Sequence, residues 1–431
     1  MGVEISRLAN GITVATERLP QFESVALGVW VKTGSRNEKP EEHGMAHLLE
    51  HMAFKGTHRR TARQIAEEIE NVGGDINAAT SVETTSYFVR VLKDDVTLGI
   101  DILSDILLNS RHDPDELERE KHVVLQEIGA ASDTPDDVVF DRFAETAFRH
   151  QPLGRPILGT RDTVMSFSAE QLHAFVAREY CGERLVIAAA GAIDHDAFTR
   201  EVENRFNGMQ PHAQGTPPSF ATYVGGDFRE YRELMDTQLV LGFEGRAYHV
   251  RDYYASQILA MLLGGGMSSR LFQEVRENRG LCYSVSAFHW GFSDTGIFGI
   301  HAATEPGDMP ELAPLILSEL KRAADDIDES ELLRARAQFR ASLLMAGENV
   351  SSRVGQIARQ ILLFGRPITN EELMDRLSKI TVLRLRDLAG RLFCGTPPTV
   401  SAVGPVDTLM SLAEMREMLT PTVPLRRAAY A

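Results

Sequence analysis

The sequence contains few cysteines, and they lie far apart. Three occur among 431 residues, at Cys181, Cys282 and Cys394, and no Cys-x-x-Cys pair is present. An odd number of widely spaced cysteines suits neither a disulfide framework nor a thiolate metal site. We therefore expect a protein of a reducing compartment.

The sequence also lacks long apolar runs and is short of basic residues. No run reaches the roughly 18 residues that a membrane span requires, and residues 1–6 show no basic region leading into an apolar secretory signal. Lysine and arginine total 45 against 61 aspartates and glutamates, a formal charge of -16. This balance argues against nucleic-acid binding, serves solubility and is compatible with a cavity that attracts basic peptides. We expect a bacterial cytoplasmic protein, or a mature mitochondrial matrix protein if the source is eukaryotic.

What the chain does contain is ample material for packed cores. Its hydrophobic content is 43% and its charged content 25%, as in folded globular proteins. A length of 431 residues exceeds what one ordinary core organises, which predicts two or three domains.

Local patterns predict alternating strands and helices in the first 130 residues. A hairpin is expected around Asn10-Gly11, and β-rich runs cover residues 25–31, 76–80 and 84–91. Thr61 and Gln64 form a capping box that begins a helix. Two further helices are predicted over 95–109 and 113–130.

Residues 47–51 read His-Leu-Leu-Glu-His within an otherwise apolar helical pattern. Positions four apart lie one turn apart on the same helix face, so His47 and His51 can chelate one metal ion. Glu50 lies on the adjacent flank, where it can accept a proton from water without being a ligand. This order matches the inverted zincin signature. The alternative is a pair of histidines with no metal, because so short a motif also occurs by chance.

A catalytic zinc site needs a third protein ligand and an open fourth position. His43 lies on the same stripe, but two helical turns span roughly 11 Å, too far for His43 and His51 to share an ion. Glu120 and Glu127 share one face of a later helix, and either fits. The spacing does not exclude two neighbours on that helix, Glu116 and Glu118.

The chain contains an internal repeat. Residues 65–74 align with 271–280 at an offset of 206, and residues 188–194 align with 401–407 at an offset of 213. The segment 209–219 has the composition of a linker. We infer two similar domains from a duplication, at 1–208 and 220–431.

The two halves differ at the motif. The counterpart of the motif helix, residues 253–263, has no histidine or glutamate, so only the first half can hold the metal. A glycine-rich turn at 264–266 follows it, but the phosphate-binding loop pattern is missing. We therefore predict no phosphate site there.

These features together resemble the pitrilysin or insulinase group of inverzincin metallopeptidases, most closely its short members related to the mitochondrial processing peptidase beta subunit. The resemblance covers nearly the whole chain. The residues that carry it are 47–51, Phe54–Thr57, Asn77, Ala78, Thr80, Glu83, Thr84, Tyr87, Glu120, Glu127 and 153–160.

The resemblance implies a role for each matching residue near the motif. It implies that His47, His51 and Glu127 bind one zinc ion per chain. It also implies that Glu50 is the general base of peptide-bond hydrolysis, and that Glu120 supports the site from behind.

The resemblance further implies a substrate-binding apparatus. Arg276 and Tyr283, seven residues apart, would hold the peptide backbone and stabilise the transition state. Asn77 and Ala78 would lie near an edge strand on which the substrate extends as an added strand.

The implied fold is α+β, two similar domains each with an antiparallel-rich sheet packed with helices. Family chambers are built from four such domains, so a two-domain chain is expected to dimerise, with itself or with a related chain. The expected function is a zinc endopeptidase acting on peptides or unfolded segments. The rivals are a presequence peptidase that cuts at one site and a non-catalytic core subunit of a respiratory complex. Those subunits lose zinc-site residues, and none is lost here.

Overall fold

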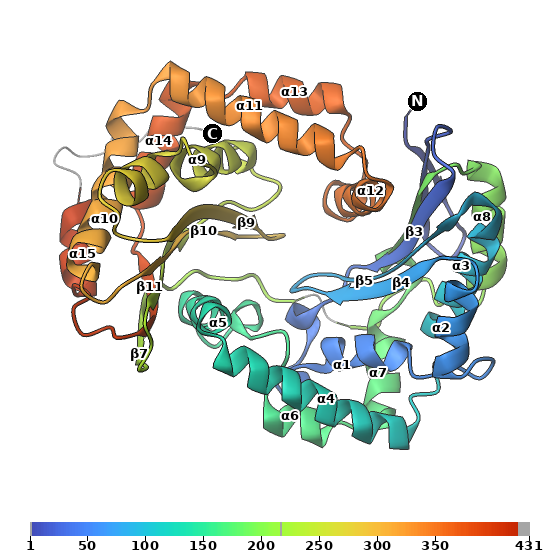
Figure 1. Cartoon of the computed structure of the whole chain (residues 1–431). Coiled ribbons are helices and arrows are strands. Elements are labelled where there is room, and N and C mark those ends of the chain that lie inside the picture. The colour runs from blue at the N-terminus through green and yellow to red at the C-terminus, as the bar shows by residue number, and fades with distance from the viewer. Residues whose placement is uncertain (1, 216–217, 421–431) are drawn as a thin grey trace. The chain divides into compact units, whose positions relative to one another are not determined.

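The computed structural model describes residues 2–215 and 218–420, and the chain divides into two compact units (Figure 1). Unit 1 consists of Met1–Ala130, Arg155–Ser219 and Leu344–Thr369, and unit 2 of Ala131–Gly154, Phe220–Leu343 and Asn370–Ala431. Each unit therefore takes most of its residues from one predicted half of the chain and one helical segment from the other. Residues 216 and 217 of the predicted linker lie outside the described residues.

Unit 1 is built on a six-stranded sheet in the order β1-β2-β6-β3-β5-β4. Every pairing is antiparallel except that of β2 with β6, so the predicted antiparallel-rich sheet is confirmed. The expected hairpin is present, because β1 and β2 pair on either side of Asn10-Gly11. The strands are β1 Glu4–Arg7, β2 Thr13–Arg18, β3 Ser24–Val31, β4 Asp75–Thr80, β5 Thr85–Leu92 and β6 Leu185–Gly191.

Helices cover both faces of this sheet. Along β3, Val25, Leu27 and Val29 point into a core shared with helices α1, α3, α7 and α8, as the two-residue period of a strand requires. The helices of unit 1 are α1 Met45–Ala53, α2 Ala62–Glu70, α3 Val96–Leu108, α4 Pro114–Asp133, which runs into unit 2, α6 Arg161–Ser166, α7 Ala169–Glu179, α8 His195–Phe206 and α12 Val350–Phe364.

The opposite face is covered by α12, which comes from the second half of the sequence (Figure 1). Its buried residues Val354, Ile357 and Ile361 recur at helical spacing and pack over Ala188 and Ala190 of β6. The small alanine side chains let the helix approach the sheet closely. Arg353 of α12 also forms an ion pair with Glu17 of β2.

Unit 2 has a five-stranded sheet in the order β7-β11-β8-β10-β9. Phe143 of α5 packs on one face, where a Cβ at Gly242 would lie 2.3 Å from its ring, and Phe393 of α14 packs on the other. The strands are β7 Gly226–Tyr231, β8 Thr237–Glu244, β9 Ser284–Gly291, β10 Gly296–Thr304 and β11 Thr399–Gly404. The helices are α5 Pro135–Ala147, α9 Tyr253–Gly264, α10 Met309–Asp326, α11 Glu329–Ala346, α13 Asn370–Ser378, α14 Val382–Phe393 and α15 Leu412–Leu419.

The two sheets share one topology, in agreement with the repeat. The order β2-β6-β3-β5-β4 in unit 1 matches β7-β11-β8-β10-β9 in unit 2, and in both the first pair is parallel and the others antiparallel. The aligned strands β6 and β11 end at Gly191 and Gly404, whose φ angles are 135° and 131°. Both positions require a backbone that a side chain disfavours.

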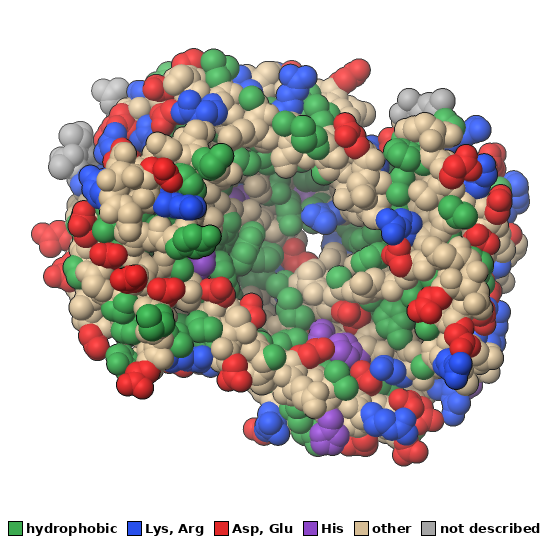
Figure 2. Space-filling model, viewed as in Figure 1, with side chains coloured by type: hydrophobic (Ala, Val, Ile, Leu, Met, Phe, Trp, Pro, Cys, Tyr) green, Lys and Arg blue, Asp and Glu red, His purple; other side chains and the backbone are tan. Residues whose placement is uncertain are grey.

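The remaining composition-based predictions bear on the surface and the thiols. All three cysteines are free. Within the part of the chain that the structure describes, no helix is long and apolar enough to cross a membrane. Acidic and basic side chains are interspersed over the face seen in Figure 2.

Candidate metal centre

Helix α1 separates apolar from chemically active side chains, as its sequence predicts. Met45, Leu48, Leu49 and Met52 are among its buried residues. The remaining side of the helix presents His47, Glu50 and His51, which are only half-buried. The imidazole ring centroids lie 4.7 Å apart.

A carboxylate from α4 completes a cluster with the two histidines. Glu127 Oε2 lies 3.5 Å from His47 Nε2 and 3.6 Å from His51 Nε2. One ligand atom from each of the three residues lies within 4.8 Å of the others. Two atoms bound to one tetrahedral zinc ion are separated by roughly 3.3 Å, so the three residues fit such an ion.

Glu120 lies behind this cluster. Its Oε2 accepts a hydrogen bond from His51 Nδ1 at 3.0 Å, and its Oε1 lies 2.7 Å from Lys55 Nζ. A proton on Nδ1 leaves the Nε2 lone pair of His51 facing Glu127. This contact places Glu120 where it would orient His51, one of the candidate ligands.

The other candidates for a third ligand are engaged elsewhere. Glu116 pairs with Arg119, and Glu118 lies 2.6 Å from Lys121 Nζ. His43 donates from Nε2 to the carbonyl oxygen of Pro156 at 2.6 Å. The prediction that His43 does not share an ion with His51 agrees with this contact.

Burial keeps His47 neutral. Burial, with a smaller effect of His51, lowers the pKa of His47 to about 4. Its Nδ1 is buried and has no hydrogen-bond partner among the described residues. A neutral imidazole beside the acidic Glu127 and Glu120 favours binding of a dication. Among the described residues, Lys55 is the one lysine or arginine side chain paired with either glutamate.

Glu50 is held by the edge strand of the sheet. Its Oε2 accepts a hydrogen bond of 2.5 Å from the hydroxyl of Thr80, at the end of β4. A hydrogen bond thus connects α1 to β4 through Glu50, the residue that the motif predicts to be the general base.

Strand β4 is the last strand of the unit 1 sheet, and within the described ranges it pairs on one side only, with β5. Asn77 is exposed, and its Oδ1 accepts a hydrogen bond of 2.8 Å from the N–H of Ala78. The structure therefore places both residues on an edge strand, as predicted.

Arg276 and Tyr283 lie together in unit 2. Arg276 belongs to a π-helical turn, Phe272–Glu277, and Tyr283 lies one residue before β9. The guanidinium carbon is 4.7 Å from the ring centroid of Phe272 and 5.1 Å from that of Tyr283. Among the described residues, no carboxylate lies within ion-pair distance of Arg276, and its guanidinium lies against two aromatic rings instead.

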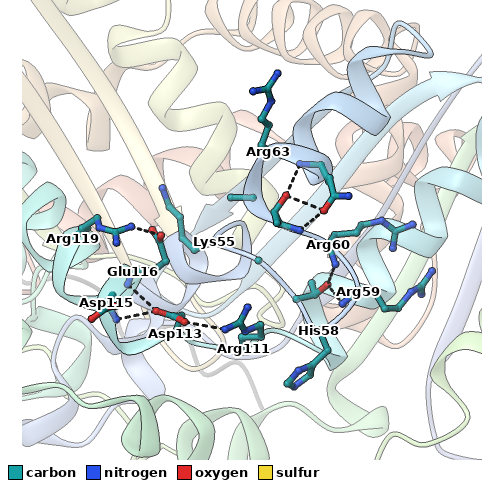
Figure 3. Close-up of a pocket in the computed structure, with 15 residues that line it drawn as sticks. Lys55, His58, Arg59, Arg60, Arg63, Arg111, Asp113, Asp115, Glu116 and Arg119 are labelled. Carbon is teal, nitrogen blue, oxygen red and sulfur yellow. Dashed lines mark hydrogen bonds and ion pairs between the residues drawn. The ribbon is translucent and has the colours of Figure 1, made fainter.

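Lys55 also lines a cavity of about 450 Å³ (Figure 3). Its lining is rich in arginine, but these side chains are already paired with carboxylates. Arg60, for example, contacts Glu68, Asp101 and Asp105. The cavity shares Lys55 with the metal centre, and its lining includes Glu116, which spacing left open as a ligand. It contains none of His47, His51 and Glu127.

Sequence reasoning left two contributors without a role. Thr80 carried part of the resemblance, but its bond to Glu50 joins segments 30 residues apart. Lys55 follows His51 by four residues and lies two residues beyond the last residue of α1, where its Nζ reaches Glu120 Oε1. That spacing was the signal available.

Comparison with known proteins gives two family matches along the chain. Residues 13–161 match the family model described as insulinase (peptidase family M16), and residues 166–339 match the one described as the peptidase M16 inactive domain.

Several relatives align over nearly the full length. A protein of Rickettsia bellii named an uncharacterized zinc protease is 40% identical over 404 residues, 93% of this chain and 97% of that protein. A probable mitochondrial-processing peptidase subunit beta of Arabidopsis thaliana is 34% identical, over 96% of this chain and 80% of that protein.

Among solved structures, a protease from Helicobacter pylori matches with a TM-score of 0.86 at 22% identity, over 94% of this chain and 99% of that one. A chain of complex III2 from Candida albicans also gives 0.86 at 22% identity, over 97% and 100%. These two likenesses concern the fold.

Proposed function

The chain belongs to peptidase family M16, the insulinase family, and on this basis we propose that it is a zinc-dependent endopeptidase with zinc held by His47, His51 and Glu127. The observation that carries the proposal is the convergence of these three side chains within 4.8 Å. Glu120 and Lys55 support the arrangement from behind.

Zinc in this position would supply Lewis acidity toward a peptide carbonyl and toward water. Glu50 would take the proton from the attacking water and deliver it to the leaving amine. The Thr80 hydroxyl, 2.5 Å from Glu50, orients the carboxylate during both transfers. A general base at this position contributes about 10²- to 10⁴-fold to the rate.

The edge of β4 would bind the substrate in an extended conformation. An incoming peptide strand would replace the Asn77 side chain as partner of the Ala78 N–H. Arg276, which has no carboxylate partner among the residues that the structure describes, and Tyr283 would then hold the peptide backbone and the developing oxyanion. The substrates we propose are peptides and unfolded segments, enclosed in a chamber that a dimer completes.

The second candidate is a presequence-processing peptidase, favoured by the similarity to a protein named as a processing peptidase subunit. Mass spectrometry of the products distinguishes the two. A processing enzyme cuts a basic presequence-like peptide at one bond and leaves an unrelated unfolded peptide intact, whereas an oligopeptidase cuts both at several bonds.

The decisive experiment measures peptide hydrolysis by the purified chain before and after chelation, with and without added zinc, and in Glu50→Gln. We expect chelation to abolish cleavage, zinc to restore it, and Glu50→Gln to lose at least about 100-fold in kcat while retaining zinc. Glu67→Gln on α2, an exposed glutamate paired with Arg63, is the matched control and should cleave normally. Cleavage that survives chelation, or full activity in Glu50→Gln, would refute the mechanism.

A further inference from the structure

The N-terminus of α1, three residues before His47, lacks a cap of its own. The residue in the cap position is Gly44, which has no side chain to accept a hydrogen bond and whose φ is 96°. Short helices are normally begun by serine, threonine, aspartate or asparagine at this place. Something more distant must satisfy the first N–H groups of the helix.

Glu38 fulfils this role from six and eight residues away. One carboxylate oxygen accepts the N–H of Gly44 at 3.0 Å and the other accepts that of Ala46 at 2.8 Å. The side chain is 3% exposed, and burial raises its pKa to about 8. A buried carboxylate is a costly way to cap a helix, because desolvation opposes its charge. A serine at the cap position would stabilise this end of the helix without burying a carboxylate. The use of Glu38 instead indicates that the position of α1 relative to the preceding loop matters.

A second segment holds the same end of the helix. Arg155 donates to the carbonyl oxygens of Glu38 and Lys39 at 2.7 and 3.0 Å. Thr163 Oγ1 donates to the carbonyl oxygen of His43 at 2.7 Å. No role of its own was predicted for the stretch 153–160. Through these hydrogen bonds, this part of the chain contacts the backbone just before α1.

The two backbones touch where both residues are glycine. Gly159 has a φ of 80°, and a Cβ there would lie 2.5 Å from the carbonyl oxygen of His43 and 2.8 Å from Gly44 Cα. A Cβ on Gly44 would lie 2.8 Å from the carbonyl oxygen of Leu158. No side chain fits between them, so the distance between the segment and the start of the helix is fixed.

The counterpart helix in unit 2 is built differently. Helix α9 follows Asp252, whose carboxylate pairs with Arg384 and Arg391 and makes no cap hydrogen bond to the helix. The helix that presents no metal ligand therefore lacks a buried carboxylate cap at its first residue.

We propose that Glu38, Arg155 and Gly159 are positioning residues of the metal centre, which fix the axial position and rotation of α1 and thereby the distance from His47 to Glu127. This inference rests on the proposed zinc function. His47 depends on it most, because its Nδ1 has no partner in the described part of the chain, whereas His51 is also held by Glu120.

The test compares metal binding in the wild type, Glu38→Gln and Gly159→Ala. Glu38→Gln keeps the shape of the side chain but replaces one oxygen with an NH2 group. That group cannot accept the hydrogen bond of the helix N–H that it faces. Affinity is measured by competition for Zn²⁺ with a chromophoric chelator, and site geometry by the visible absorption of the Co²⁺-substituted protein. We expect both variants to bind Zn²⁺ about 10- to 100-fold more weakly, which is the range for mutations of residues that orient metal ligands without binding the metal. We also expect both to shift the absorption spectrum of the Co²⁺-substituted protein.

Glu42→Gln is the matched control, because Glu42 is a partly buried glutamate of the same segment that pairs with Arg178 and not with α1. It should lose stability without changing either metal readout. Wild-type affinity and an unchanged Co²⁺ spectrum in folded Glu38→Gln and Gly159→Ala would overturn the proposal.

If a variant lacks the native circular dichroism spectrum, Zn²⁺ affinity and the Co²⁺ spectrum are measured in Arg155→Lys instead. This substitution removes only the guanidinium that donates to the carbonyl oxygens of Glu38 and Lys39. A wild type that binds neither Zn²⁺ nor Co²⁺ would refute the proposed function itself, a result distinct from equal binding in all proteins.

Discussion

At the metal centre, the two glutamates of α4 have different contacts, so their substitution should weaken zinc binding to different extents. Glu127 faces both imidazole Nε2 atoms, whereas Glu120 contacts His51 Nδ1 and Lys55. Glu127→Ala removes a ligand and should abolish measurable zinc binding. Glu120→Gln should weaken it about 10- to 100-fold.

Glu118→Gln is the control for this pair, because Glu118 lies on the same helix and is paired with Lys121. Zinc content after equilibrium dialysis provides the measurement. Equal zinc loss in Glu120→Gln and Glu127→Ala would contradict the assignment of separate roles.

His289 predicts a pH dependence in unit 2. It is buried in β9, its Nε2 accepts the backbone N–H of Arg246 at 3.0 Å, and burial, above all, lowers its pKa to about 3. The unfolded chain takes up the proton near pH 6.5, so stability is full above that value. It falls as the pH drops from 6.5 toward 3, by up to about 1.4 kcal/mol per pH unit.

Denaturant unfolding of the chelator-treated protein at pH 7.5 and 5 measures this dependence. His289→Asn should reduce the difference in unfolding free energy between the two pH values, even if the variant is less stable at both. An identical pH dependence in the variant would show that another group is responsible.

The residue scale also shows what sequence alone can predict. His47, Glu50 and His51 can be predicted as site residues from helical spacing, because positions three and four residues apart lie on the same side of a helix. Spacing left several glutamates of α4 open as ligands, and Glu127 was chosen by resemblance. Glu38 was not predicted, because a carboxylate that caps a helix from a loop leaves no periodic signal.

At the scale of elements, α12 packs on one face of the unit 1 sheet and should stabilise it. Ile357 is fully buried between α12 and the sheet. Ile357→Ala should lower the free energy of unfolding by about 2–5 kcal/mol. Hydrogen exchange should show faster exchange in β3 and β6.

Leu383→Ala is the matched control, because Leu383 lies on α14 and is 74% exposed. It should change stability by less than about 0.5 kcal/mol. Unaltered exchange in β6 of Ile357→Ala would show that α12 does not support this sheet.

Several elements of unit 1 were predictable from local pattern, including the hairpin at Asn10-Gly11 and the Thr61 capping box. The assignment of α5 to unit 2 and of α12 to unit 1 was not. An amphipathic helix shows which of its faces is buried, but its sequence does not say which of two similar sheets it covers.

At the scale of the whole molecule, we predict a homodimer. The chain has two units, and a chamber of four such units needs two chains. Sedimentation should give twice the mass of the 431-residue chain, and specific activity should fall on dilution below the dimer dissociation constant. Full activity in a species that sediments as a monomer would refute this prediction.

The exchange of helical segments between the units determines how the chain can be divided. A cut in the segment 209–219 would leave the N-terminal fragment without α12 and the C-terminal fragment without α5. Each fragment would expose the apolar face of a sheet and, expressed alone, should aggregate. Expressed together, the two should recover a soluble complex, so the protein is a candidate for fragment complementation even though its sequence divides cleanly into two repeats.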